Sequence, residues 1–467
     1  MNNIRIYNTL TNKKDELKPM NGKKINFFVC GPTVYDYSHL GHARSYVIFD
    51  AFVKYLKHLK YNVFYLQNIT DIDDKIIARS RERKVSPKAL ALAFEKEYLK
   101  NMKLLGVDSV TKYARATNYM KKILSQVKRL QDKGYAYELK GDGIYFDISK
   151  FKKYGKLSGR TAIQAEDAVS RIDYSKNKRN RGDFCLWKFK QDSSEPSWPA
   201  PFGEGRPGWH IEDTAISEKF FGAQYDIHAA ARDLIFPHHE AEISQMEALS
   251  GKSPMAKYWM HAGFLTVNGQ KMSKSLGNFI TIDDFLKRYP VRYLRFFITK
   301  NLWSSPVDFS DTVMIEARST VEKIEDFLRK LKGLKSIQTD NQASNLLKQT
   351  KEKFYNELAD DFNTPKAYAV FFDLIKTTNQ LIDVNGVSKK EGKEIYDFFV
   401  EINKIFGIID FKKVNEAIPK DIKELAKERE KCRDNREWKQ ADVLRAKIEK
   451  QGYVVEDTKD GPVVKKM

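Results

Sequence analysis

The chain begins with a pattern of apolar and polar positions that is typical of a parallel α/β sheet. Residues 25–30 (INFFVC) form a short apolar run, and apolar positions then recur with a helical period from about Ala43 to Leu59. A second apolar run, NVFYLQNI, ends in the polar residues TDIDDK. This order of strand, loop, helix and strand predicts a sheet whose functional groups lie at the carboxyl ends of its strands.

The pattern changes several times farther along the chain. A stretch rich in Gly, Pro, Ser, Trp and Lys interrupts the sheet pattern, which later resumes, and helical periodicity dominates the last third of the chain. We therefore expect an α/β domain of Rossmann-like type split by an insertion, followed by an all-α bundle and a small cap. The predicted parts are the first half of the Rossmann-like domain (1–135), the insertion (136–208), the second half (209–265), a linking fold with a polar loop (266–310), the helical bundle (311–410) and the C-terminal cap (411–467).

Composition adds an expected partner and compartment. The 82 Lys and Arg residues exceed the 62 Asp and Glu residues, which gives a formal net charge of +20 and favours a polyanionic partner such as nucleic acid. Cys30, Cys185 and Cys432 lie far apart, so we expect no disulfide framework. The N-terminus has no apolar signal region, and no run approaches the roughly 18 apolar residues of a membrane span, which favours a cytoplasmic protein without a membrane partner.

Two short motifs indicate the chemistry. His39-Leu40-Gly41-His42 follows the first predicted strand, and Lys271-Met272-Ser273-Lys274-Ser275 lies in a polar loop more than two hundred residues later. Each string alone is weak evidence for a function, because short motifs recur by chance. Together, in this order and in these contexts, they resemble the signature pair of class I aminoacyl-tRNA synthetases, which activate an amino acid by attack of its carboxylate on the α-phosphate of ATP.

That resemblance implies roles for the motif residues. His39, His42, Lys271 and Lys274 are expected to be catalytic, because they can stabilise charge that develops on the phosphate oxygens. ATP is expected to contact His39, Gly41, His42 and Lys274, with Mg²⁺ on its phosphates. The two imidazoles would act at a helix N-terminus, Gly41 would let the nucleotide approach the backbone, and the lysines would lie on a mobile loop.

The surrounding sequence resembles one family of these enzymes, the cysteinyl-tRNA synthetases. The matching stretches occur in the family's order from residue 30 to residue 461: CGPTVYDYSHLGHARS, NITDIDDKI, DFCLWK, EPSW, GRPGWHIE, FPHHEAE, VNGQKMSKSLGNF, ADDFNTP and EDTKDG. The resemblance implies a class I catalytic domain, L-cysteine, ATP and tRNA(Cys) as partners, and a zinc ion that binds the substrate thiol. It also implies a cysteine pocket that includes Cys30, Thr70 and Trp209.

The stretch FPHHEAE raises the question of the metal directly. If a helix begins just after Pro237, His238 and Glu242 share one face, while His239 and Glu240 point elsewhere. These residues alone favour an ordinary solvent-exposed helix face over a metal site. The resemblance, however, places metal ligands at four positions, which here are Cys30, Asp213, His238 and Glu242.

Asp213 departs from the family, which usually has a cysteine at this position. Replacing the thiolate with a carboxylate keeps the formal charge of the four ligands but makes the ligand set harder. The affinity for zinc should therefore fall, and other divalent ions should compete better. We favour a retained metal. The alternative is that the metal is lost and Asp213 only makes local hydrogen bonds.

Further departures keep other functions open. Ala229, Ala230, Ala231 and Arg232 replace a glycine-rich segment of the family, and the C-terminal tail lacks the family's usual aromatic residue. Trp438 is expected to pack between helices, and a monomer is favoured. The alternatives are a cysteine ligase that acts on a small amine, which the long basic C-terminal region disfavours, and an RNA-binding paralogue without activity, which the two intact motifs disfavour.

Overall fold

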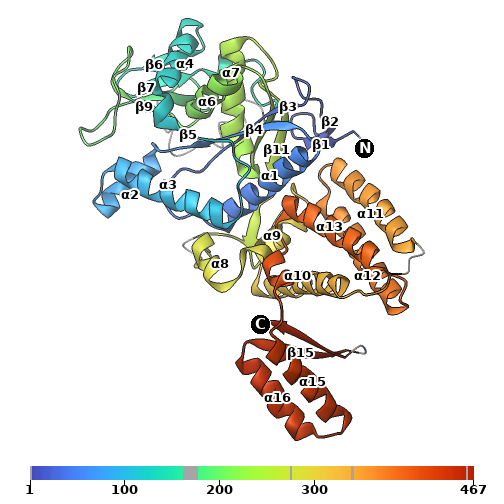
Figure 1. Ribbon diagram of the computed structural model, residues 1–467. Coiled ribbons are helices and arrows are strands. Elements are labelled where there is room, and N and C mark those ends of the chain that lie inside the picture. The colour runs from blue at the N-terminus through green and yellow to red at the C-terminus, as the bar shows by residue number, and fades with distance from the viewer. Residues whose placement is uncertain (1–2, 161–176, 274–275, 338–340, 459–460, 467) are drawn as a thin grey trace.

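The computed structural model describes residues 3–160, 177–273, 276–337, 341–458 and 461–466, and at its centre is a five-stranded parallel sheet with the strand order β11-β10-β3-β4-β5 (Figure 1). The fold class predicted from the sequence is confirmed. The strands are β3 (Lys24–Val29), β4 (Asn62–Ile69), β5 (Lys112–Arg115), β10 (Tyr225–Ala231) and β11 (Ala256–Ala262).

Alternating side chains of β3 build two separate cores, one on each face of the sheet. Phe27 and Val29 belong to the core beneath helix α1 (Leu40–His58), whereas Phe28 and Cys30 belong to the opposite core. Because successive side chains of a strand point to opposite faces, this alternation follows directly from the strand. The opposite core is covered by α4 (Met120–Asp132), α6 (Ile211–Phe221) and α7 (Glu240–Ser250). Helices α2 (Asp74–Arg83) and α3 (Pro87–Leu104) follow β4.

Smaller sheets flank this centre. The region after α4 forms an antiparallel sheet of β6 (Ala136–Leu139), β7 (Gly143–Phe146), β8 (Phe184–Phe189) and β9 (Gly205–Pro207). An N-terminal hairpin, β1 (Arg5–Asn8) and β2 (Lys13–Glu16), packs beside β11. After β11 come β12 (Leu265–Val267), β13 (Gln270–Lys271) and β14 (Val307–Phe309), which form a sheet of their own, with α8 (Ile282–Arg288) and α9 (Val291–Thr299) between β13 and β14.

A helical bundle follows and is fastened to the catalytic half by a buried arginine. The bundle contains α10 (Asp311–Lys332), α11 (Gln342–Ala359), α12 (Thr364–Asp383), α13 (Lys389–Phe406) and α14 (Phe411–Asn415). Arg295 of α9 donates to the carbonyls of Phe406 at 2.6 Å and Leu105 at 2.9 Å, and to Asp50 Oδ2 of α1 at 3.2 Å. Its guanidinium therefore joins the end of α13, the end of α3 and the middle of α1.

The C-terminal part lies beyond the bundle, at the end of the molecule far from the catalytic sheet (Figure 1). It consists of α15 (Lys420–Asp434), α16 (Trp438–Lys450), β15 (Tyr453–Thr458) and β16 (Gly461–Lys466), around a small core that includes Ile422 and Ile448. The expected helix packing of Trp438 is wrong: the side chain is 55% exposed at the first turn of α16, with the Arg433 guanidinium 5.5 Å from the centre of one ring. None of the described helices is long and apolar enough to cross a lipid bilayer.

Candidate active site

A cavity of about 590 Å³ lies among residues that follow the carboxyl ends of β3, β4 and β10. Parallel sheets commonly bind ligands at this edge. Side chains from both sequence motifs and from the predicted cysteine pocket line this one cavity. The predicted site residues in its lining are Cys30, His39, Gly41, His42, Thr70, Trp209, Asp213, His238 and Lys271. Glu242 lies behind this lining, and Lys274 falls outside the described residues.

The two histidines of the first motif form the N-terminal cap of α1. This helix begins at Leu40, three residues earlier than expected, with His39 as the N-cap residue. Nδ1 of His39 accepts from the backbone N–H of Gly41 at 3.0 Å, and Nδ1 of His42 accepts from the N–H of His39 at 3.2 Å. Burial lowers the pKa of His39 to about 4 and, together with the neighbouring His39, lowers the pKa of His42 well below its ordinary value. Both rings are therefore neutral at physiological pH.

Gly41 is required by the folded position of the His39 ring. A Cβ atom at Gly41 would lie 2.8 Å from Cε1 of His39 and 2.9 Å from its Nδ1, closer than van der Waals contact allows. Cε of Met272, in the second motif, would lie 3.4 Å away. The glycine thus makes room for a neighbouring side chain, in addition to the expected approach of the nucleotide.

Backbone hydrogen bonds bring the second motif beside the first. The N–H of Leu40 donates to the carbonyl of Ile280 at 3.1 Å, and the N–H of Ile282 donates to the carbonyl of Ser38 at 2.9 Å. The segment that follows the lysine motif is therefore attached directly to the start of α1. Lys271, on β13, is exposed to solvent at the cavity wall, so its ammonium group is available to a ligand.

The four predicted metal ligands converge from four segments. Cys30 follows β3, Asp213 lies in the first turn of α6, and Glu242 lies in α7. His238 lies in the kinked turn η6 (Ile235–His239) that leads into α7. All four are buried, and their donor atoms lie within 4.8 Å of one another. This set, which we call the pocket-facing set, combines a thiol, an imidazole and two carboxylates, and such donors fit a divalent ion.

Contacts within the pocket-facing set are direct. His238 Nε2 lies 2.8 Å from Glu242 Oε1 and 3.1 Å from Asp213 Oδ2. Burial lowers the pKa of His238, but the adjoining Glu242 and Asp213 carboxylates outweigh burial and raise this pKa to about 10. Burial raises the pKa of the Cys30 thiol well above its ordinary value, and the nearby Glu242 and Asp213 raise it further. A bound cation would counter this surplus of negative charge.

The expected direction of His239 is wrong. The backbone is not helical at Phe236 (φ −138°, ψ 134°), and the helical conformation resumes after this kink and continues into α7. His239 therefore lies three residues before Glu242, a spacing that also places two side chains on one face of a helix. His239 Nε2 consequently lies 3.2 Å from Cys30 Sγ. Glu240 does point away from the site, because its carboxylate accepts from the backbone N–H groups of Gly155, Leu157 and Ser158.

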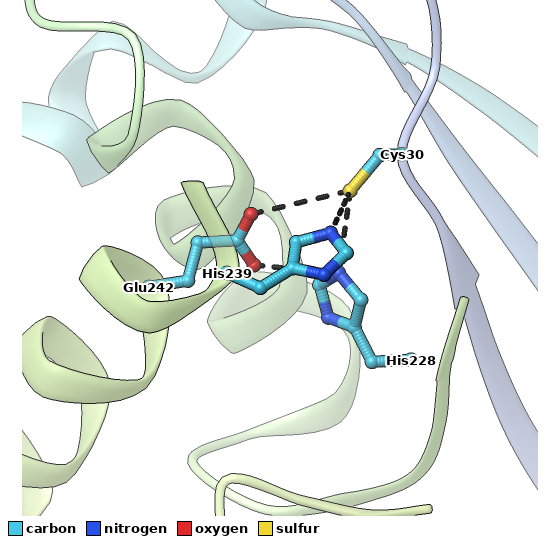
Figure 2. A group of neighbouring side chains, drawn as sticks. All are labelled: Cys30, His228, His239 and Glu242. Atoms are coloured by element: carbon cyan, nitrogen blue, oxygen red, sulfur yellow. Dashed lines mark hydrogen bonds and ion pairs between the residues drawn. The ribbon is translucent and has the colours of Figure 1, made fainter. Parts of the chain in front are cut away.

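The sequence motifs did not identify several other residues at the site. His228 of β10 also lies 3.2 Å from Cys30 Sγ through its Nε2 (Figure 2). His261 of β11 contacts His239, with 2.8 Å between its Nε2 and Nδ1 of His239. Lys75 of α2 lines the cavity, with its ammonium 5.6 Å from the Tyr35 ring centre and 6.0 Å from that of Trp209. The only signal in the sequence for Lys75 was its place directly after the polar end of a predicted strand.

The wall residues are held by buried hydrogen bonds. Thr70 Oγ1 donates to Glu212 Oε2 at 2.8 Å, and Asn68 Nδ2 donates to Asp213 Oδ1. The Trp209 ring stacks on His238, with 4.3 Å between the ring centres. These contacts fix the orientation of the cavity wall next to the pocket-facing set.

Known proteins are similar to this chain in sequence and in fold. A family model for the catalytic domain of class I (C) tRNA synthetases matches residues 16–319, a DALR domain model matches 353–410, and a cysteinyl-tRNA ligase anticodon binding domain model matches 415–462. The methionyl-tRNA synthetase of Mycobacterium tuberculosis, solved with methionyl-adenylate, has a similar fold, with a TM-score of 0.61 at 14% identity over 82% of this chain and 90% of that one.

Similar proteins also match over nearly their whole length. The chain is 44% identical to the cysteine–tRNA ligase of Thermoplasma volcanium, over 97% of this chain and 98% of that protein. It is 42% identical to the cysteine–tRNA ligase of Thermococcus gammatolerans, over 99% of both chains. It is also 42% identical to that of Clostridioides difficile, over 98% of this chain and 99% of the other. With this identity and coverage, the chain belongs to the cysteine–tRNA ligase family of class I aminoacyl-tRNA synthetases.

Proposed function

We propose that the protein activates L-cysteine with ATP and transfers the cysteinyl group to the 3′-terminal adenosine of tRNA(Cys). One observation carries the proposal: a single cavity is lined both by the motif residues His39, His42 and Lys271 and by the thiol-binding candidates Cys30 and His238. A cysteine whose thiol faces the second group can direct its carboxylate towards a nucleotide held by the first group.

In the first step, a carboxylate oxygen of cysteine attacks the α-phosphorus of ATP, and the bond to the pyrophosphate oxygen breaks. Negative charge grows on the phosphate oxygens and on the leaving pyrophosphate. His39 and His42 use Nδ1 to accept backbone hydrogen bonds, so each neutral ring offers its Nε2–H as a donor. Lys271 and Lys274 add positive charge from the loop, and Mg²⁺ is proposed to accompany the ATP phosphates.

The pocket-facing set is proposed to hold the family's divalent metal, with zinc as the first candidate. Such an ion, when bound, acts as a Lewis acid that lowers the pKa of the substrate thiol and favours sulfur over the hydroxyl of serine. Cys30, Asp213, His238 and Glu242 would be its ligands. Trp209 and Thr70 form the adjoining wall and limit the size of the side chain that fits.

In the second step, a ribose hydroxyl of the terminal adenosine attacks the carbonyl carbon of the adenylate, and the bond to the AMP oxygen breaks. The formal net charge of +20 supports a polyanionic acceptor, and so do the family models that match the DALR and anticodon binding parts. The proposal also includes a cytoplasmic location and a monomeric chain. Transfer to a small amine, or RNA binding without catalysis, would be different outcomes of the same tests.

The decisive experiment measures cysteine-dependent exchange between ATP and radioactive pyrophosphate, followed by charging of total tRNA with labelled cysteine. We expect exchange with cysteine but not with serine, and label in tRNA that is released by mild base. Exchange without charging would indicate a small acceptor. Binding of tRNA without exchange would indicate a paralogue that has lost catalysis.

A further inference from the structure

One asparagine side chain holds the backbone of the lysine motif. The N–H of Ser273 donates to Asn278 Oδ1 at 2.8 Å, and Nδ2 of Asn278 donates to the carbonyl of Lys271 at 3.2 Å. Because an N–H can only donate and a carbonyl can only accept, these two partners fix the orientation of the amide. We propose that Asn278 is a positioning residue for the activation step, which holds the backbone of Lys271 so that its ammonium group reaches the ATP phosphates. This inference rests on the proposed function.

The chain reaches Lys271 through a tight hairpin. Strand β13 ends at Lys271, which pairs with Thr266 of β12. The turn between these strands consists of Asn268 and Gly269, with φ angles of 50° and 74°. Positive φ at both positions is typical of the hairpin turn that the Asn-Gly pair favours. Strand pairing therefore fixes Lys271 from one side but does not extend to Ser273.

The chain leaves the motif along the first turn of α1. The Phe279 ring meets the His39 ring edge to face, with 5.1 Å between the ring centres and 70° between their planes. Thr281 forms an antiparallel bridge with His39, and backbone hydrogen bonds on either side continue this attachment. Asn278 directly precedes the attached segment, so its position is set by the same turn that carries the two motif histidines.

Asn278 therefore joins two anchored segments. Its backbone leads into the segment fastened to α1, and its side chain holds the segment that carries Lys271. Met272, between the two bonded residues, packs against the main core and lies beside Gly41, so a shift of this backbone would also move a wall of the cavity. A displacement of about 1 Å in a positioned group can cost about 100-fold in rate, so even weak hydrogen bonds at this place affect the reaction.

The alternative explanation is that Asn278 only completes a local turn. The Ser273 hydroxyl accepts from the N–H of Leu276 at 3.2 Å, so part of this turn is closed without the asparagine. Lys271 and Leu276 are exposed, and Asn278 is only partly buried. A turn with so little buried surface contributes little to global stability, whereas its bond to Lys271 links it to the cavity.

The first test does not depend on activity. Trypsin cleaves the peptide bond after Lys271, and the carbonyl of that bond accepts the hydrogen bond from Asn278. We expect initial cleavage at this bond, identified by mass spectrometry of the fragments, to be at least about fivefold faster in Asn278→Ala than in the wild type, because cleavage follows the fraction of molecules in which the segment is open. Asn345→Ala, at an exposed position of α11, is the matched control. Equal cleavage rates in Asn278→Ala and the wild type would overturn the proposal.

The second test separates positioning from a general loss of structure. In cysteine-dependent pyrophosphate exchange, Asn278→Ala should lower kcat at least about fivefold and leave the KM for cysteine within about twofold, because Lys271 acts on developing charge and not on the thiol site. Asn278→Asp should lower kcat at least as much, since its carboxylate can accept from Ser273 but repels the Lys271 carbonyl. A rise in the KM for cysteine that matches the fall in kcat would indicate a distorted cavity and overturn the proposal.

A double-mutant cycle identifies the residue through which Asn278 acts. If Asn278 acts by holding Lys271, its removal has no further effect once the lysine side chain is absent. We expect Asn278→Ala combined with Lys271→Ala to exchange at the rate of Lys271→Ala alone, within about twofold. Multiplied losses would overturn the proposal. Absence of exchange in the wild type would refute the proposed function and this role with it, whereas a loss in Lys271→Ala with normal exchange in Asn278→Ala would overturn the inference alone.

Discussion

The backbone N–H of His39 donates to Nδ1 of His42, while Nδ1 of His39 accepts from the N–H of Gly41. This reciprocal cap fixes the tautomer of both rings, because a neutral imidazole that accepts at Nδ1 carries its proton on Nε2. The motif therefore supplies two uncharged donors at the start of a helix, where the helix dipole adds to their attraction for phosphate.

The fixed tautomer predicts different effects for two substitutions of His42. The amide nitrogen of Gln can take the place of Nε2, whereas that of Asn takes the place of Nδ1. We expect His42→Gln to keep cysteine-dependent exchange within about tenfold. His42→Asn should lose roughly 100-fold to 1,000-fold, the usual effect of removing one donor to a transition state. Equal losses in the two variants, measured as kcat of exchange, would contradict the assigned tautomer.

The same histidines predict a particular pH dependence. Burial lowers the pKa of His39 to about 4, so this ring stays neutral as the pH falls past the ordinary histidine value of 6.5. A neutral donor remains present throughout this range, and we expect no loss of the exchange rate from His39 until the pH approaches 4. The measurement is the exchange rate as a function of pH in the wild type and in His39→Gln. An acidic limb near 6.5 that disappears in the variant would argue against a neutral His39.

Gly41→Ala should impair activation without unfolding the protein. The added Cβ would displace the His39 ring, which now lies within 2.8 Å of that position. We expect exchange to fall by at least about tenfold, since even a small displacement of a catalytic donor costs about 1.4 kcal/mol or more. Gly333→Ala is the matched control, because its nearest atom would be a carbonyl oxygen at 3.4 Å. If Gly41→Ala unfolds at the same temperature as the wild type and also keeps a normal exchange rate, the steric argument is wrong.

The lysine motif should act on adenylation and not on tRNA binding. Lys271→Ala and Lys274→Ala are each expected to lower the exchange rate by at least roughly tenfold, because both would stabilise charge on the departing pyrophosphate. Lys287→Ala, on the exposed side of α8, is the control. Filter binding of tRNA should be nearly unchanged in all three variants, and near-normal exchange in the first two would refute their assignment.

Removal of the C-terminal part should separate the two half-reactions. Val414 of α14 is buried in the main core, so the truncation is best placed after Glu416, at the start of the C-terminal part. We expect this variant to keep exchange within about threefold and to lose most tRNA charging. Equal loss of both activities would show that the segment supports the catalytic fold.

The periodic elements could be predicted from the sequence because local patterns encode them. The apolar run at 25–30 forms β3, and the periodic stretch before Leu59 forms α1. The sequence pattern predicts a start of α1 that is three residues too late, because histidine is not a common N-cap residue, whereas Ser, Thr, Asp and Asn are. Here the imidazole Nδ1 takes the place of the usual side-chain oxygen.

The histidines behind Cys30 could not be found in the same way. His228 pairs with Phe28 in the parallel register of β10 and β3, which places its side chain on the same face as Cys30. That register joins segments about two hundred residues apart, and no local pattern specifies it. For His239, the sequence contains its spacing of three residues from Glu242 but does not show that Cys30 is its neighbour, because that contact also joins segments about two hundred residues apart.

Arg295 has a mechanical consequence. One guanidinium fastens the middle of α1, whose first turn bears the histidines of the motif, to the end of α13, from which the chain continues towards the C-terminal part. Because both contacts are buried, the catalytic half and the bundle form one stiff frame at this point. The distance from the cavity to the bundle is therefore fixed. We expect an RNA that contacts both the cavity and the bundle to be selected by its length and bend as well as by its bases.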